Sequence, residues 1–78
     1  MQTPDIRIAD APMQTLIQVE AARMQLRVSK QELCAAAGVK AEMYSYMMRR
    51  GRQGHDLPDD CLQKILGAIK KLRTKKRP

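Results

Sequence analysis

The sequence predicts an all-α fold: a compact four-helix domain that contains a helix-turn-helix, with a flexible N-terminal arm and a basic C-terminal tail. Only 3% of the residues are aromatic, whereas Ala, Leu and Met are plentiful, which favours helices over sheet. Apolar residues recur at steps of three and four along most of the chain. With 78 residues the chain suffices for one domain, which excludes large catalytic folds such as a Rossmann sheet or an α/β barrel.

Residues 1–11 form the predicted N-terminal arm, because they lack helical periodicity. Within the arm, Ile6-Arg7-Ile8 alternates like a short strand. Two interpretations stay open: a mobile arm, or a segment that pairs with a second subunit. The domain itself is expected over residues 12–72.

The first two helices are marked by their caps. Pro12 suits a first helical turn, and an apolar stripe predicts a helix over about 13–27. Ser29 and Glu32 then form a capping box, which predicts a second helix from Lys30. Gly38 ends it, because glycine adopts the left-handed conformation at little cost. The inward residues expected are Leu16, Val19, Ala22 and Leu26 of the first helix, and Leu33, Cys34 and Ala37 of the second.

A third helix is predicted over 40–50, with Gly51 as its end. Its candidate core residues are Val39, Met43 or Tyr44, Met47 and Met48, and we expect the methionines to fill the core. Pro58 is expected in the first turn of a fourth helix, whose apolar stripe is Leu62, Ile65, Leu66, Ile69 and Leu72. Residues 73–78 are predicted to be a charged tail; from Cys61 onward there are seven basic residues and no acidic one.

Residues 30–49, KQELCAAAGVKAEMYSYMMR, carry the functional signal. Two helices joined at a glycine by about three residues are typical of a helix-turn-helix. From Leu26 to Gly51 the chain resembles the lambda-repressor-like family, which includes Cro and the xenobiotic-response-element type regulators. The resemblance covers about residues 16–72 and consists of the Ser-x-x-Glu-Leu helix, the Gly-Val turn and the Arg/Gly loop. The chain differs in having Met47-Met48-Arg49-Arg50 where relatives usually carry an acidic residue, one extra residue before Gly51, and a basic tail in place of a fifth helix.

The resemblance implies which residues would contact double-stranded DNA. The outward face of the recognition helix would meet base edges in the major groove, with Arg49 on guanine and Glu42 accepting from cytosine. Residues flanking the motif would hold the phosphate backbone. The base-contacting set is Lys40, Ala41, Glu42, Ser45, Tyr46 and Arg49, and the backbone-contacting set is Lys30, Gln31, Arg50 and Arg52.

Charge and cysteine content agree with such a role. A net charge of +7 favours an anionic partner, with nucleic acid foremost. Two cysteines are too few for a disulfide framework, and neither a signal peptide nor a membrane span is evident, so a cytoplasmic protein is expected. His55 lacks metal-ligand spacing to either cysteine, and no nucleophile has a positioned base. We therefore expect no metal, no cofactor, no small-molecule substrate and no enzymatic activity.

The leading hypothesis is a homodimeric transcriptional regulator, a repressor of the phage or mobile-element type, that binds an inverted repeat. We expect the dimer surface on Leu62, Ile65 and Ile69 first, and on the Ile6-Arg7-Ile8 segment second. The alternative is a protein-interaction module, an inhibitor or adaptor that binds an acidic protein through the same surface. A third hypothesis, RNA binding through residues 73–78, requires that tail for all binding; otherwise the tail adds nonspecific phosphate affinity or is simply solvated.

Overall fold

The computed structural model describes residues 11–75 and confirms the all-α prediction: within that range there are four helices and no strand. They are α1 (Pro12–Leu26), α2 (Lys30–Ala37), α3 (Ala41–Arg52) and α4 (Asp59–Lys75). The Ile6-Arg7-Ile8 segment and the end of the basic tail lie outside the described residues.

Local chemistry fixes the limits of α2. The Ser29 hydroxyl accepts from the Glu32 backbone N–H at 3.0 Å, and the Glu32 carboxylate accepts from the Ser29 N–H at 3.1 Å, so the predicted capping box is present. Gly38 ends the helix in the left-handed region with φ 70°, as expected. Gly38 to Lys40 form the short connection to α3.

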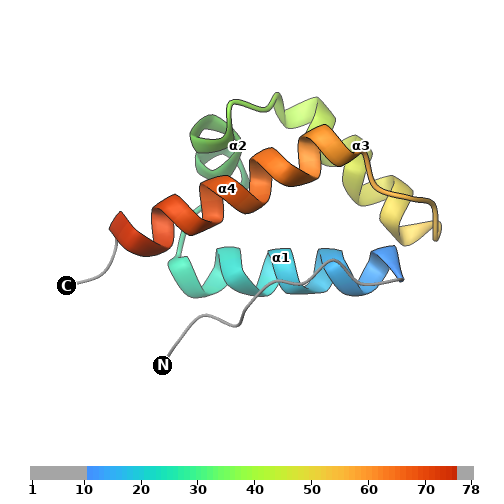
Figure 1. Ribbon diagram of the computed structural model, residues 1–78, viewed down its shortest axis with the longest axis horizontal. Coiled ribbons are helices and arrows are strands. Elements are labelled where there is room, and N and C mark those ends of the chain that lie inside the picture. The colour runs from blue at the N-terminus through green and yellow to red at the C-terminus, as the bar shows by residue number, and fades with distance from the viewer. Residues whose placement is uncertain (1–10, 76–78) are drawn as a thin grey trace.

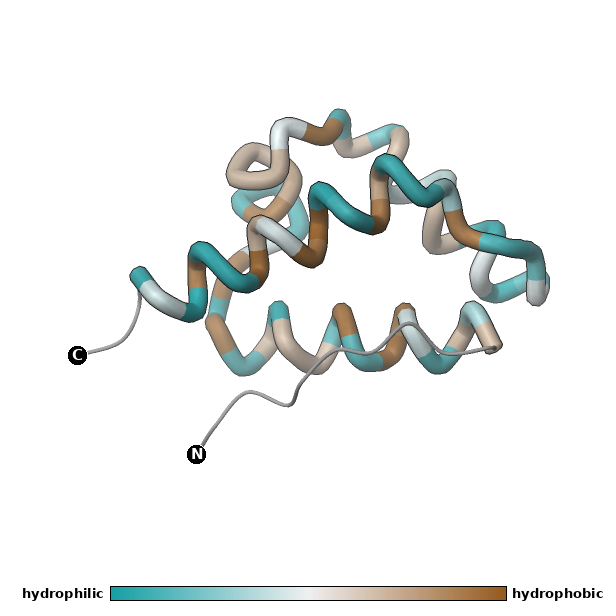
Figure 2. Tube along the Cα trace, viewed as in Figure 1, coloured by the Kyte–Doolittle hydropathy of each residue, from teal (hydrophilic) through white to brown (hydrophobic). Residues whose placement is uncertain are grey.

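The four helices enclose one core. In Figure 1, α1 lies along one side of the molecule, α4 crosses the front, and α2 and α3 complete the bundle. α4 contacts each of the other three helices, and the apolar turns of α1 and α4 face one another in Figure 2. The buried core consists of Leu16, Val19, Ala22, Leu26, Val28, Leu33, Cys34, Tyr44, Met47, Cys61, Leu62, Ile65, Ala68 and Ile69.

The prediction that Gly51 ends the third helix is wrong. α3 continues to Arg52, and Gly51 is buried within it, where a Cβ would overlap the side chain of Leu16. This glycine therefore serves close packing of α3 on α1, and the left-handed residue of the loop is Gly54, with φ 80°.

Both ends of α4 also differ from the prediction. The helix begins at Asp59, and the Leu62 N–H donates to the Pro58 carbonyl at 2.9 Å, so Pro58 precedes the first turn. At the other end, Arg73 to Lys75 continue the helix instead of opening the tail. Basic side chains are favourable in a last turn, where they face the negative end of the helix dipole.

Candidate nucleic-acid interface

α3 has one buried and one exposed side. Tyr44, Met47 and Gly51 face the core. The six residues predicted to contact bases all lie exposed on or at the start of this helix: Lys40, Ala41, Glu42, Ser45, Tyr46 and Arg49. At about 100° per residue, the side chains of Glu42, Ser45, Tyr46 and Arg49 spread over roughly a third of the helix circumference, opposite the core residues.

A polar cluster on the inner side of α3 anchors it to α1. The Tyr44 hydroxyl donates to Glu20 Oε2 at 2.9 Å, and Arg23 Nε donates to the same oxygen at 2.7 Å. Arg23 also donates to the Val28 carbonyl at 2.8 Å, which joins the end of α1 to the approach to α2. The Glu20 side chain is only 22% exposed, so the cluster is largely shielded from solvent. The Glu20–Arg23 spacing of three residues was the available signal for this ion pair.

The ionisation of this cluster follows from its contacts. Burial opposes the charge on Glu20, but the hydrogen bonds from Arg23 and Tyr44 outweigh it and hold the pKa of Glu20 below its ordinary value. Burial, together with the neighbouring Glu20 carboxylate, raises the pKa of Tyr44. The cluster is therefore a neutral phenol and an ion pair at physiological pH, and it fixes the seat of α3.

Arg50 makes contacts within the chain. Its Nε donates to the Asp56 carbonyl at 2.8 Å, and its guanidinium carbon lies 5.7 Å from the centre of the Tyr46 ring. A longer hydrogen bond of 3.4 Å joins its other nitrogen to the Tyr46 hydroxyl. These contacts brace the loop after α3 and orient Tyr46, and the phosphate contact of Arg50 stays a prediction.

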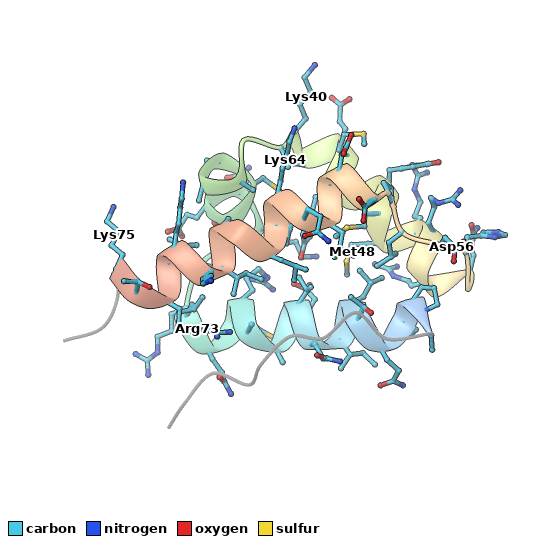
Figure 3. The ribbon with its side chains drawn as sticks, viewed as in Figure 1. Lys40, Met48, Asp56, Lys64, Arg73 and Lys75 are labelled. Atoms are coloured by element: carbon cyan, nitrogen blue, oxygen red, sulfur yellow. The ribbon has the colours of Figure 1, made fainter. Side chains whose placement is uncertain are left out.

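The other predicted backbone-contacting residues are exposed and flank the same helix. Lys30 and Gln31 lie in the first turn of α2, and the Lys30 ammonium is 3.9 Å from a Glu20 oxygen. Arg52 follows Ser45 by two helical turns, on nearly the same side of α3. In Figure 3, Lys40 and Lys64 extend away from the body toward the same edge of the view.

The methionines divide between core and surface. Met47 is fully buried as expected, and Met48 is half-buried. Met43 is 41% exposed, so the expectation that it fills the core is wrong; Tyr44 takes the inward position, because its hydroxyl finds a partner in Glu20.

An apolar groove that was not predicted from the sequence lies between α1 and α3. It has a volume of about 340 Å³ and is lined mainly by apolar side chains of α1, with Met48 and Arg52 from α3. The signal was a second apolar stripe on α1, offset from the core stripe: Met13, Ile17, Ala21 and Met24.

The helix-4 residues expected to form a dimer surface are not available. Leu62, Ile65 and Ile69 are at most 3% exposed, because α2 and the other helices cover them.

Among residues 11–75 no group of three or more His, Cys, Asp or Glu side chains could hold a metal ion. The helices in this range are all too short or too polar to cross a membrane. Comparison of the chain with protein families, curated proteins and solved structures gives no match.

Proposed function

We propose that the chain is a sequence-specific DNA-binding transcriptional regulator, in which α2 and α3 form a helix-turn-helix and α3 enters the major groove. The proposal depends on one observation: α3 is packed against the core on one side and exposed on the other. Its inner side is fixed by Tyr44, Met47 and Gly51, while the predicted base-contacting residues are exposed. A helix about 10–12 Å across suits a groove about 12 Å wide.

The exposed side chains suit distinct contacts on a duplex. Arg49 presents a guanidinium that can donate two hydrogen bonds to guanine O6 and N7. Glu42 can accept from cytosine N4, and its place in the first turn of α3 is favourable for the helix dipole. The three cations Lys30, Arg50 and Arg52, together with Gln31, would contact phosphates and set the register without reading sequence.

The mode of action follows from the small reach of one helix. A single recognition helix reads only a few base pairs, so two copies on an inverted repeat, with half-sites one helical turn apart, would supply the missing specificity. Bound there, the protein would repress by occluding polymerase. We place it in the cytoplasm, where the buried thiols of Cys34 and Cys61 remain reduced.

Fluorescence anisotropy with a labelled duplex tests the proposal. Three phosphate contacts give a salt slope of about −2.7, so affinity should fall about 40-fold between 50 and 200 mM salt. Arg49→Ala should cost about 1–3 kcal/mol on a preferred site selected from a random duplex pool and relax one base position. Arg52→Ala should weaken all sequences alike and reduce the salt slope by about one. Absence of binding at about 50 mM salt, or identical behaviour of the two variants, would contradict the proposed roles.

A second candidate function is a protein-interaction module that binds an acidic partner. Met43 and Tyr46, each 41% exposed on α3, favour it, because exposed Met and Tyr side chains are typical of protein interfaces. Met43→Ala distinguishes the two functions: it should leave the affinity for a selected duplex within about twofold if α3 binds DNA.

A further inference from the structure

Within residues 11–75, no other element packs on the apolar groove between α1 and α3. Ile17 is 52% exposed, Met24 is 64% exposed and Met13 is 37% exposed, all on one side of α1. Ala21 lies between the two larger exposed side chains, and Met48 of α3 continues the face. Such a continuous apolar surface is typical of an interaction site.

The groove lies on the flank of α3, at right angles to its predicted DNA-contacting side. At about 100° per residue, Met48 and Arg52 lie about a quarter turn from the centre of the face formed by Glu42, Ser45, Tyr46 and Arg49. Consider a two-fold axis that passes through the groove and runs parallel to the direction in which the DNA-contacting face of α3 points. Two copies related by this axis present their α3 helices on the same side of the dimer. This is the symmetry that an inverted repeat requires.

We propose that this groove binds a second copy of the chain, with α1 packed against α1 of the partner across a two-fold axis. The inference rests on the proposed function for its biological meaning. Ala21 allows the two helices to approach closely, while Ile17, Met24 and Met48 interlock around it.

The available area indicates a weak dimer. Specific interfaces take about a tenth of the surface of a small protein, which for a surface of 5559 Å² is about 550 Å² per copy. α1 is about 22 Å long and each helix about 10 Å wide, so a face two helices wide has a footprint of about 400 Å². That size belongs to transient complexes. Two adjacent half-sites would then hold the copies together on DNA.

Charge adds a signature that separates dimerisation from DNA binding. Each copy carries a net charge of +7, so association of two copies is opposed by repulsion that salt screens. Dimerisation should therefore strengthen as salt rises, whereas DNA binding weakens.

Sedimentation equilibrium of the full chain, from about 1 to 500 μM, tests the proposal. The native chain should show a monomer–dimer equilibrium that strengthens with salt. Ile17→Glu, which buries a carboxylate in the interface, should weaken it at least about tenfold. Gln63→Glu is the matched control, because it makes the same charge change at an exposed position of α4 outside the groove. Both variants should retain the helical circular dichroism of the native chain, since both positions are exposed.

Further variants identify the occupant of the groove. Met24→Glu should reproduce the effect of Ile17→Glu, and Ile6→Asp combined with Ile8→Asp should leave dimerisation unchanged. If the Ile6/Ile8 variant dimerised more weakly, the N-terminal residues would form the interface. If it dimerised more strongly, they would occupy the groove in the native chain. Either result would overturn the proposal. So would a native chain that is monomeric throughout at high salt, or an Ile17→Glu variant that dimerises normally.

DNA binding separates this proposal from the preceding one. Ile17→Glu should bind a half-site duplex like the native chain and lose tight binding to the inverted repeat. If no duplex is bound but Ile17→Glu still abolishes the dimer, the proposed function fails and the groove assignment stands. If DNA binding survives in a chain that never dimerises, the groove assignment fails alone.

Discussion

Substitution of Gly51 is the sharpest test of how closely α3 packs against α1. A Cβ at this position would overlap Leu16 Cδ1 and lie 2.9 Å from Leu16 Cγ and 3.1 Å from Leu57 Cδ2. Leu16 is only 2% exposed, so it has little room to move away. Gly51→Ala therefore requires α3 to shift or the core to repack.

Two opposing effects set the magnitude. Replacing glycine by alanine inside a helix stabilises it by about 0.5–1 kcal/mol, whereas overpacking a core costs about 1–3 kcal/mol. Because the overlap with Leu16 is severe, we expect Gly51→Ala to lower the free energy of unfolding by about 2 kcal/mol. Gly67→Ala is the matched control: it lies inside α4 with nothing within 4 Å of an added Cβ, and should gain about 0.5–1 kcal/mol.

Urea unfolding, followed by circular dichroism, gives the free energy of unfolding of both variants, and thermal unfolding gives their melting temperatures. For a domain of this size, 1 kcal/mol shifts the melting temperature by about 4–8 °C, so Gly51→Ala should melt roughly 10 °C lower and Gly67→Ala roughly 5 °C higher. Because Gly51 lies in the last turn of α3 and Gly67 in the middle of α4, the gain in helix propensity is at most as large at Gly51, and the rest of the difference between the variants is the steric cost. If Gly51→Ala were as stable as Gly67→Ala, the close approach of α3 to Leu16 would be refuted.

Three further predictions concern the cap and the polar cluster. Ser29→Ala should lower the free energy of unfolding measured in urea by about 1 kcal/mol, whereas Ser45→Ala, exposed in mid-helix, should leave it unchanged or raise it by up to about 0.5 kcal/mol. Glu20→Gln should cost about 1–3 kcal/mol at pH 7. Because the pKa of Glu20 is lowered by folding, the gap to the native chain should close as the pH falls below about 4.3, and a constant gap would contradict the ion pair. Because folding raises the pKa of Tyr44, the native chain should lose stability above about pH 10. Tyr44→Phe should remove this loss. If the melting temperature of the variant fell with alkaline pH as much as that of the native chain, the burial of Tyr44 beside Glu20 would be refuted.

The features that depend on a single short segment of the chain were predicted correctly from the sequence. The capping box of Ser29 and Glu32 and the left-handed Gly38 each depend on a few neighbouring residues, and the structure confirms both. The apolar stripes of α1 and α4 were also readable, because helical periodicity selects the buried face before any partner is known.

Features that depend on distant segments were not readable in the same way. Gly51 looked like a helix end, because its role as a contact point for Leu16 exists only once α1 and α3 meet. Met43 and Tyr44 were equivalent candidates until Glu20 supplied a partner for the phenol. Arg50 looked like an exposed cation, since the Asp56 carbonyl that binds it is placed by the loop. The exposed side of α3 could be predicted from helical periodicity. The groove beside it could not, because it exists only where α1 and α3 pack together.

Amide chemical-shift mapping shows whether the exposed side of α3 contacts a duplex. Titration of the ¹⁵N-labelled protein with a selected duplex of about 20 base pairs, which spans two half-sites, should perturb the amides of Glu42, Ser45 and Arg49 most. The exposed α4 positions Gln63 and Gly67 should change little. Perturbations confined to residues 73–78, or none along α3, would contradict the account.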